Sequence, residues 1–513
     1  MQTRKYLLLI FFIGLLLYFT SFFNNFLWDD EEFIVNNPTV RSVKNIPGFF
    51  FGKSSANSAY YRPIMSSVYS FLFVASGGKP LLFRLFQVGI HLINTGLIFL
   101  LFSEFFQFKK SLPFFLALIF LVHPANVEAV SFISAAQEVL FFLFGMIGLL
   151  LLIKGKRDLN DLFLASILFF LSLLTKETGI IFLAIAVVYI YYHNKKDLLN
   201  FTVINIIFIF IYFLNRLLLG TTYVQGQGLF PIMRVSFVQR LLTVPKITFF
   251  YLEKFFFPMK LAIAQHWVVL SPDLKNFYLP LFIDLVFFLL AVFVVVRKKN
   301  KLFNFFFFWF IISLLPHLQI IPLNMTVAER WFYLPMVGLL GMIGVVVEEE
   351  FYRIPRSLVM ILIGTVLVLL FSRTIIRNQN WKNELTLFSH DGKEKNISFD
   401  LENNLGVALF RSGNADQAEI HIKRSTELAP YWWVNWNNLG AIYERKGDFE
   451  KAESFYKKSL ERGNYYLAYE NYTGILIRQK KYQEAKEFLE KKGLIILPNN
   501  EKLNLFYRYL LQI

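Results

Sequence analysis

The sequence contains no cysteine. This absence excludes disulfide bonds, thiolate metal ligands and a cysteine nucleophile, and it leaves the compartment open. Charged residues are also sparse, at 17% of the 513 residues. No separate domain combines basic and aromatic residues, so the formal net charge of +16 does not indicate nucleic-acid binding. The excess of Lys and Arg instead suits cytoplasmic loops and anionic lipid headgroups.

Hydrophobic residues, by contrast, make up 56% of the chain, and 62 residues are Phe. A soluble protein of this length could not bury so much apolar surface. Repeated apolar runs therefore predict an all-α protein with a polytopic membrane domain over residues 1–380. We read the first run as an uncleaved span. Spans are predicted near 6–23, 81–106, 112–123, 138–153, 162–175, 179–192, 199–219, 277–296, 302–321, 332–347 and 357–376.

The basic residues that cluster between the predicted spans fall on one side of the membrane, and the short loops on the other side carry almost none. Because Lys and Arg are enriched in cytoplasmic loops, the basic side and the N-terminus are predicted to be cytoplasmic. Eleven spans then place the C-terminus outside, and in a bacterium the membrane would be the inner membrane. The basic positions are Arg4, Lys5, Lys109, Lys110, KGKR (154–157), Lys195, Lys196, RKKNK (297–301), Arg353 and Arg356.

Two further apolar segments, 61–76 and 235–257, do not fit this alternation of sides. If residues 235–257 crossed the membrane, RKKNK would face outward, against the charge rule. Pro245 and the interspersed charges suit a helix that lies at the interface. Both segments are therefore predicted to be interfacial helices on the outer face.

The tail, residues 381–513, has a different composition and a repeat. NNLG ends at Gly406 and recurs ending at Gly440, and NYTG ends at Gly474, at intervals of 34 residues. A helix–turn–helix unit of this length is typical of tetratricopeptide (TPR) repeats. We predict an α-solenoid of about three repeats and a closing helix near 500–512, with Gly and Ala at the helix contacts.

Four consecutive carboxylates follow the first span, in the stretch WDDEE. Acidic side chains at the membrane surface are costly unless they pair with a cation, a metal or a substrate. We interpret Asp29 and Asp30 as a catalytic pair and Glu31 and Glu32 as solvated neighbours. An ordinary solvated acidic loop is the alternative.

Other loops on the predicted outer side supply charged and imidazole side chains. Taken singly, such residues are more often helix-end anchors or ion pairs. Together they provide the cations and carboxylates that suit a phosphate-bearing lipid donor. The candidates for binding substrate are Arg62, His123, Glu128, Lys176, Glu177, His266, Glu329 and Arg330.

These groups predict transfer of a sugar from a polyprenyl phosphate. Lys176 and Arg330 would neutralise the phosphate, and Asp29 or Asp30 would take the proton of the incoming hydroxyl. The transition state would resemble an oxocarbenium ion, which nearby negative charge stabilises. No cofactor is firmly predicted. If a divalent cation such as Mg²⁺ or Mn²⁺ takes part, Asp29, Asp30 and Glu128 offer oxygen ligands.

The chain resembles the GT-C membrane glycosyltransferases, most of all the transmembrane-and-TPR protein O-mannosyltransferases. The resemblance rests on the order of several short segments and on the repeat tail, and it covers nearly the whole chain. These segments are WDDEEFIVNNPTV, YYRPIMSSVYSF, FRLFQVGIHLINTGLIFLLF, HPANVEAVSFISAAQEVLFFLF, LLTKETGI and AERWFYLP.

The resemblance implies inverting transfer of a sugar, mannose in the best-known members, to a protein Ser or Thr hydroxyl. It implies that Asp29 and Asp30 match the family's first acidic pair and that Glu128 matches the next acidic position. Lys176, Glu177, Glu329 and Arg330 match later charged positions. The chain departs from the family at Gln137 and Glu138, where an Arg/Asp pair is usual, and its repeat tail is short, so sugar and acceptor contacts are left open.

Three other functions fit parts of the sequence. A ligase or polymerase of lipid-linked glycans would rely more on outward Arg and His than on an acidic pair. A membrane-anchored TPR scaffold would need one span, and its clustered outer charges would be superfluous. A transporter would carry ionisable residues near the middle of the bilayer, which most spans lack. The repeat domain is interpreted as a guide for the acceptor protein.

Overall fold

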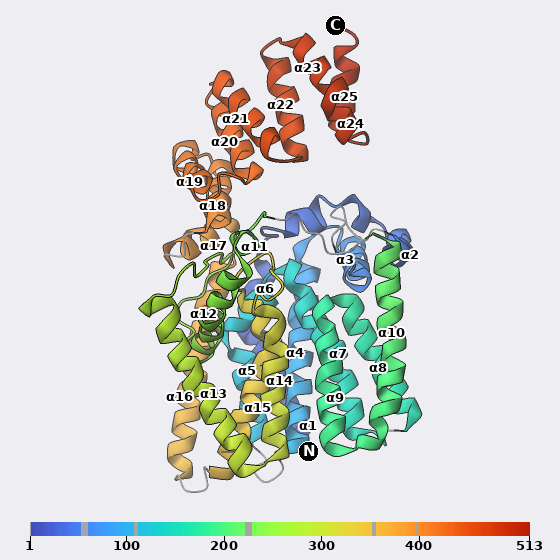
Figure 1. The fold of residues 1–513 in the computed structure, drawn as a ribbon, viewed down its shortest axis with the longest axis vertical. Helices are drawn as coiled ribbons and strands as arrows, with labels where there is room; N and C mark the ends of the chain where they lie inside the picture. Colours follow the sequence, from blue (N-terminus) through green and yellow to red (C-terminus); the bar gives the residue numbers. More distant parts are fainter. Residues whose placement is uncertain are drawn as a thin grey trace. The chain divides into compact units, whose positions relative to one another are not determined.

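The computed structural model describes residues 2–52, 60–106, 111–156, 158–220, 228–350, 355–394 and 398–513. The regular secondary structure in these ranges is helical (Figure 1). The chain divides into two units, and the division after Asn383 lies next to the boundary predicted at residue 380. The second unit also includes a short segment, Ala264–Trp267, from the middle of the sequence.

The first unit is a bundle of long apolar helices. α4 lies against α5 and α7, α7 against α8, and α14 against both α9 and α15. Its helices are α1 (Gln2–Tyr18), α2 (Ile46–Phe51), α3 (Pro63–Ser76), α4 (Pro80–Phe105), α5 (Leu112–Val122), α6 (Val127–Ser131), α7 (Ala136–Lys154), α8 (Leu159–Thr175), α9 (Ile181–His193), α10 (Leu198–Leu218), α11 (Pro231–Arg234), α12 (Phe237–Phe256), α13 (Leu279–Lys298), α14 (Lys301–Leu314), α15 (Tyr333–Glu350) and α16 (Arg356–Asn380).

The prediction of a multi-pass membrane protein is confirmed. Seven helices in the described ranges are long and apolar enough to cross a membrane. The bent pair formed by α5 and the segment Pro124–Ser131 makes an eighth, with a bend of 52° where Pro124 interrupts the helix. Three of the predicted spans coincide with shorter apolar helices: Leu159–Thr175, Glu177–His193 and Lys301–His317.

The two segments predicted to lie at the interface are also helical, as α3 and α12. Pro245 lies inside α12, and Ser236 starts this helix with a capping box to Gln239. α12 is not among the described helices that pass the length and hydropathy test for a span.

The direction of the helices brings distant parts of the sequence to one end of the first unit. α1, α8 and α16 end there, and α4, α7 and α15 begin there (Figure 1). Lys154, Lys195 and the stretch 297–301 lie at the opposite helix ends. Four of the predicted basic positions, Lys109, Lys110, Arg157 and Arg353, lie outside the described residues.

The second unit is a stack of helix pairs, which confirms the predicted α-solenoid. α18 pairs with α19, and α20 with α21; α22 and α23 form the third pair, and α25 contacts α22. Its helices are α17 (Glu384–Asp391), α18 (Phe399–Arg411), α19 (Ala415–Leu428), α20 (Trp433–Arg445), α21 (Phe449–Arg462), α22 (Tyr466–Arg478), α23 (Tyr482–Phe488), α24 (Leu494–Ile496) and α25 (Glu501–Leu510).

The small residues of the repeat behave as expected in two of the three units. Ala418, Ala452 and Ala485 are fully buried. A Cβ atom added at Gly406 would lie 2.6 Å from the side chain of Ile422, and one at Gly440 would lie 2.6 Å from the ring of Tyr456. The expectation fails at Gly474, where the nearest atom, on Phe506, would be 3.8 Å away, at ordinary contact distance.

This difference predicts opposite outcomes for two matched substitutions. Gly440→Ala should destabilise the second unit by about 1–3 kcal/mol, because the methyl group collides with the buried Tyr456 ring. Gly474→Ala should be neutral or stabilise by up to about 1 kcal/mol, since Ala favours helix and the site has room. Hydrogen–deuterium exchange of the peptides covering 433–478 in the intact protein would measure both changes. Equal effects of the two substitutions would contradict this account of the repeat contacts.

Candidate active site at one end of the helix bundle

The two aspartates that follow the first span occupy different environments. Asp30 is fully buried. The backbone N–H and the hydroxyl of Ser134 donate hydrogen bonds to its Oδ1 at 2.7 and 2.6 Å, and the backbone N–H of Leu27 donates to its Oδ2 at 3.0 Å. Asp29 is only half-buried. Its negative charge acts electrostatically on Arg330.

A tight turn separates these two carboxylates from the first helix. Trp28 has a left-handed backbone with φ of +52°, which is uncommon for a residue other than glycine. Its indole stacks on Phe132 at 5.3 Å between ring centroids. The hydrogen bond between Leu27 and Asp30 closes the same turn. Asp30 therefore holds the loop in place and leaves Asp29 at its surface.

Near the start of α4, Arg84 joins the loop to the end of α6, and Gln87 bonds to α6 and to the residue that follows it. The guanidinium of Arg84 is buried and donates to the carbonyl oxygens of Asn24 (2.9 Å), Asn25 and Ser131 (2.8 Å). The side-chain amide of Gln87 donates to the carbonyls of Ala129 and Phe132, both at 2.7 Å. The acidic loop is thus anchored to the chain segment that carries Glu128 and Ser134.

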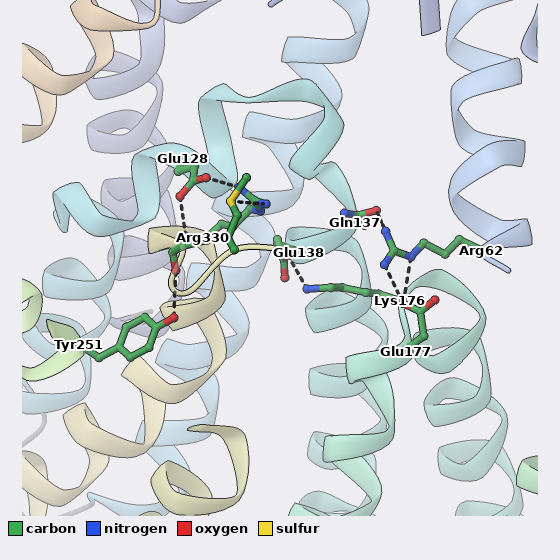
Figure 2. A network of polar contacts seen from close by, with 10 residues as sticks. Arg62, Glu128, Gln137, Glu138, Lys176, Glu177, Tyr251 and Arg330 are labelled. Atoms are coloured by element: carbon green, nitrogen blue, oxygen red, sulfur yellow. Dashed lines mark hydrogen bonds and ion pairs between the residues drawn. The ribbon is translucent and has the colours of Figure 1, made fainter. Parts of the chain in front are cut away.

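Three ion pairs lie side by side at this end of the bundle (Figure 2). Arg330 donates from Nη1 to Glu128, whose other oxygen accepts the backbone N–H of Arg330 at 3.0 Å. Lys176 donates to Oε1 of Glu138 at 2.5 Å.

The third pair, in the same row, is formed by Arg62 at the start of α3. Arg62 donates from Nε and Nη2 to Oε2 of Glu177, at 3.0 and 2.8 Å. Its Nη1 donates to Oε1 of Gln137 at 2.8 Å. The amide of Gln137 therefore helps to hold this guanidinium (Figure 2).

The three pairs act on one another electrostatically. The positive charge of Lys176 interacts with those of Arg62 and Arg330, and the charge of Glu138 reaches both arginines. The Lys176–Glu138 pair and the Arg330–Glu128 pair are almost entirely buried, whereas Arg62 and Glu177 are partly exposed. The three cations, each neutralised by a glutamate, therefore form a row in which the Arg62 pair is partly exposed and the other two pairs are buried.

His317 belongs to this cluster, although the sequence analysis did not select it. It is buried, and its imidazole stacks on Trp331 at 5.0 Å between ring centroids. The charges of Lys176 and Arg330 both act on this ring. Within the described part of the chain, Nδ1 of His317 is buried without a hydrogen-bond partner. Its stretch LLPHLQI is apolar and carries no signal of a site.

Three predicted site residues have other surroundings. Both ring nitrogens of His123 meet backbone groups: Nδ1 accepts from Ala125 at 3.2 Å and Nε2 lies 3.1 Å from the carbonyl of Phe255. Glu329 accepts the backbone N–H of Ala262 at 2.7 Å and lies 3.9 Å from the buried Arg377.

The third of these residues, His266, belongs to the second unit. Its Nε2 lies 2.9 Å from Oδ2 of Asp400, at the start of α18. Its ring also packs near Phe399, at 5.0 Å between centroids. The Ala264–Trp267 segment is thus built into the first TPR repeat.

Asp29, Asp30 and Glu128 were considered above as oxygen ligands for a divalent cation, and their arrangement does not fit such a site. Among the described residues, no group of three or more His, Asp or Glu side chains is arranged to hold a metal ion. Both oxygens of Asp30 accept hydrogen bonds, from Ser134 and Leu27, and both oxygens of Glu128 accept hydrogen bonds from Arg330. No step through a metal is derived from this geometry.

A small pocket opens between the partly exposed ion pair and the segment that follows the acidic loop, at Phe33 and Asn37. Arg62, Gln137, Tyr69 and Ser134 are among its lining residues. Its cavity volume of about 60 Å³ has room for a few water molecules or a small polar group. The pocket connects the Arg62 guanidinium with the residue that supports Asp30.

Comparison with known proteins supports the predicted family resemblance and the repeat. A family model described as a tetratricopeptide repeat matches residues 398–464. A protein O-mannosyl-transferase of Caenorhabditis elegans is 26% identical over 444 residues, which cover 84% of this chain and 63% of the relative. A human protein O-mannosyl-transferase is 24% identical over 474 residues, which cover 80% of this chain and 50% of the relative. The chain therefore spans about half to two thirds of the length of these curated relatives.

Among solved structures, the oligosaccharyltransferase of Archaeoglobus fulgidus in its apo form is similar, with a TM-score of 0.44 and 12% identity. The match covers 73% of this chain and 56% of that chain. The predicted resemblance is confirmed: the relatives found by sequence are transmembrane-and-TPR protein O-mannosyltransferases.

The burial of Asp30 predicts a stability that depends on pH. Burial raises the pKa of Asp30 from 3.8 to about 6, against the opposing effects of the Ser134 and Leu27 hydrogen bonds and the Arg84 charge. Because the folded state holds this proton more tightly, the contribution of Asp30 to stability is complete below pH 3.8 and is lost as the pH rises through 6. The loss amounts to about 3 kcal/mol.

Denaturant unfolding of wild type and Asp30→Asn between pH 4 and pH 8 would measure this effect. Wild type should be the more stable protein at pH 4, because Asn cannot accept the Leu27 N–H with its amide nitrogen. That advantage should shrink as the pH rises. Glu32→Gln, at an exposed position of the same loop, is the matched control. A difference between wild type and Asp30→Asn that is the same at every pH would contradict the assignment.

Proposed function

We propose that this chain is a membrane glycosyltransferase that moves a sugar from a polyprenyl-phosphate-linked donor to a Ser or Thr hydroxyl of a protein. The names of its relatives point to mannose as the sugar. The basic residues at the helix ends opposite the ion pairs favour a site on the outer face of the membrane.

The observation that carries this proposal is the row of ion pairs beside Asp29. A buried cation normally needs an anionic partner, and here each of three cations has one carboxylate. Lys176 uses one of its three N–H donors on Glu138, so donors are left for a substrate oxygen. A lipid phosphate that reaches this row would meet cationic groups that their carboxylate partners already hold in place.

His317 adds a further hydrogen-bonding group at the same place. Its buried Nδ1 has no hydrogen-bond partner within the described residues, and its ring interacts electrostatically with Lys176 and Arg330. A buried polar atom without a partner is costly, so a ligand that satisfies it gains affinity. A phosphate oxygen or a sugar hydroxyl between Lys176 and Arg330 would meet this need.

The environments of the two aspartates support a division of roles. Asp30 has both oxygens filled by hydrogen bonds from Ser134 and Leu27, so it suits the positioning of the loop. Asp29 is half-buried and lies within electrostatic reach of Arg330. We therefore assign the general base to Asp29 and a positioning role to Asp30.

The proposed reaction is a single displacement. Asp29 takes the proton of the acceptor hydroxyl, and the hydroxyl oxygen forms a bond to the anomeric carbon of the sugar. The bond between that carbon and the phosphate oxygen breaks, and polyprenyl phosphate leaves with its charge compensated by Lys176 and Arg330. Attack opposite the leaving phosphate inverts the configuration at the anomeric carbon.

The substitution Asp29→Asn tests this assignment. It should lower kcat for sugar transfer by about 10²–10⁴-fold, the usual contribution of a general base, while KM for the donor changes by less than about threefold. Purified protein in nanodiscs, with radiolabelled polyprenyl-phosphate mannose and a Ser/Thr-containing acceptor, would give both constants. Glu32→Gln removes a nearby exposed charge and serves as the control.

Two outcomes would count against the proposal. If Asp29→Asn keeps the kcat of wild type, the acidic loop has no role in the chemistry. If wild type consumes none of a panel of lipid-phosphate sugars, the proposed function itself fails.

A further inference from the structure

The small pocket beside Arg62 is lined by polar groups and by aromatic rings. Its polar lining includes Gln137 and Ser134, and the rings of Phe33 and Tyr60 add apolar surface. The guanidinium carbon of Arg62 lies over the Tyr60 ring, 4.3 Å from its centroid. We call this cavity, of about 60 Å³, the Arg62 pocket.

Three residues of the Arg62 pocket have N–H groups to spare. A guanidinium has five N–H groups, and Arg62 uses three of them on Glu177 and Gln137. Because arginine only donates, its bond to Oε1 of Gln137 fixes the orientation of this carboxamide, and no residue in the described ranges accepts from Nε2. Asn37 donates one of its two N–H groups to the carbonyl of Phe33 at 3.1 Å. The pocket therefore offers several hydrogen-bond donors.

The same pocket also offers acceptors. The hydroxyl of Tyr69 donates to the carbonyl of Ile133 at 3.2 Å, and that of Ser134 donates to Asp30 at 2.6 Å. A hydroxyl that has donated its proton still accepts through its lone pairs. A ligand group that both accepts and donates hydrogen bonds, as an alcohol does, therefore matches the lining of the Arg62 pocket.

The charge and the size of the pocket narrow the ligand further. Glu177 neutralises Arg62 and the other lining residues are uncharged, so a neutral ligand group is favoured. A cavity with room for a few water molecules cannot take a whole hexose ring. The secondary hydroxyls of a hexose are attached directly to the ring, whereas its hydroxymethyl group projects by one additional carbon. This group can enter a recess that excludes the ring, and its CH₂ suits the aromatic surface of Phe33 and Tyr60.

The Arg62 pocket adjoins the groups assigned to the reaction. Ser134 bonds to Asp30 of the acidic loop. Gln137 directly precedes Glu138, the partner of Lys176, and the charge of Arg62 acts on Lys176 (Figure 2). The sugar of a donor whose phosphate lies at Lys176 can therefore reach this pocket.

We propose that the Arg62 pocket binds the hydroxymethyl group of the donor hexose. Its hydroxyl accepts hydrogen bonds from Arg62 and Gln137 and donates one to Tyr69 or Ser134. Gln137 is then a specificity-determining residue, because a sugar without this hydroxyl leaves the N–H groups of the pocket unpaired. This inference rests on the proposed function for the donor, a hexose linked to polyprenyl phosphate.

The experiment compares two donors that differ in a single oxygen atom, polyprenyl-phosphate mannose and polyprenyl-phosphate 6-deoxymannose. The full chain in nanodiscs transfers each sugar to a Ser/Thr-containing peptide, and kcat/KM is measured for each donor. The 6-deoxy donor is also assayed as a competitor of the mannose donor, which gives its affinity where its transfer is slow. The protein variants are Gln137→Leu and, as the control, Gln379→Leu, the same change at an exposed position of α16.

Wild type should use the mannose donor at least about tenfold more efficiently than the 6-deoxy donor, the loss expected when buried donors are left unpaired. Gln137→Leu should lower kcat/KM for the mannose donor by at least about tenfold and that for the 6-deoxy donor by less than about threefold. Most of the preference should thus be lost. Gln379→Leu should keep the preference of wild type.

Equal use of the two donors by wild type would overturn the inference and leave the proposed function standing, and this comparison needs no variant to fold. An equal loss for both donors in Gln137→Leu, the result of a purely structural role, would also overturn it. A raised KM for the peptide alone would assign the pocket to the acceptor instead.

If Gln137→Leu fails to fold, Gln137→Glu takes its place, since it keeps an acceptor for Arg62 and removes the two N–H donors. The same loss of preference is expected of this variant. If wild type transfers no hexose from any lipid phosphate, the proposed function fails and the inference fails with it.

Discussion

A charged side chain that leaves water for the interior of a helix bundle needs an opposite charge and several hydrogen bonds to replace its lost solvation. This requirement explains the arrangement at one end of the first unit. Arg330, Lys176 and Arg62 each bond to one glutamate, and each partner comes from a distant part of the sequence. The ion pairs thereby join α3, α7 and the ends of α6, α8 and α15. The contacts that order the candidate site therefore also link elements of the bundle.

The same requirement separates the two aspartates of the acidic loop. Asp30 accepts hydrogen bonds from Ser134 and Leu27, and the buried Arg84 donates to the backbone carbonyl of Asn24 in the same loop. Asp29 is left half-buried beside Arg330. In the proposed reaction, one carboxylate holds the loop and the other takes the proton.

Much of this could be predicted from the sequence, because helices and repeats depend on local patterns. The apolar runs correctly predicted the long apolar helices, and the 34-residue period correctly predicted the paired helices of the repeats. The choice of ion-pair partners depends on the tertiary structure: nothing in SAAQEVL indicates that Gln137 would meet Arg62 and Glu138 would meet Lys176. Asp29 and Asp30 are adjacent in the sequence but differ in burial, and this difference also depends on the tertiary structure. His266 lies in the second unit because a short segment joins the repeats, and His317 stood in an apolar stretch without a recognisable pattern.

The central claim, that the paired cations receive the donor phosphate, is tested most directly by the affinity for polyprenyl phosphate without a sugar. The informative protein is Lys176→Met/Glu138→Met, which removes a cation together with its partner and so leaves no unpaired buried charge. His317→Phe keeps the stacking on Trp331 and removes the ring nitrogens. The account predicts that both proteins bind polyprenyl phosphate at least about tenfold more weakly than wild type, and that their affinity for the uncharged polyprenol is unchanged. Wild-type affinity of both folded variants for polyprenyl phosphate would contradict it.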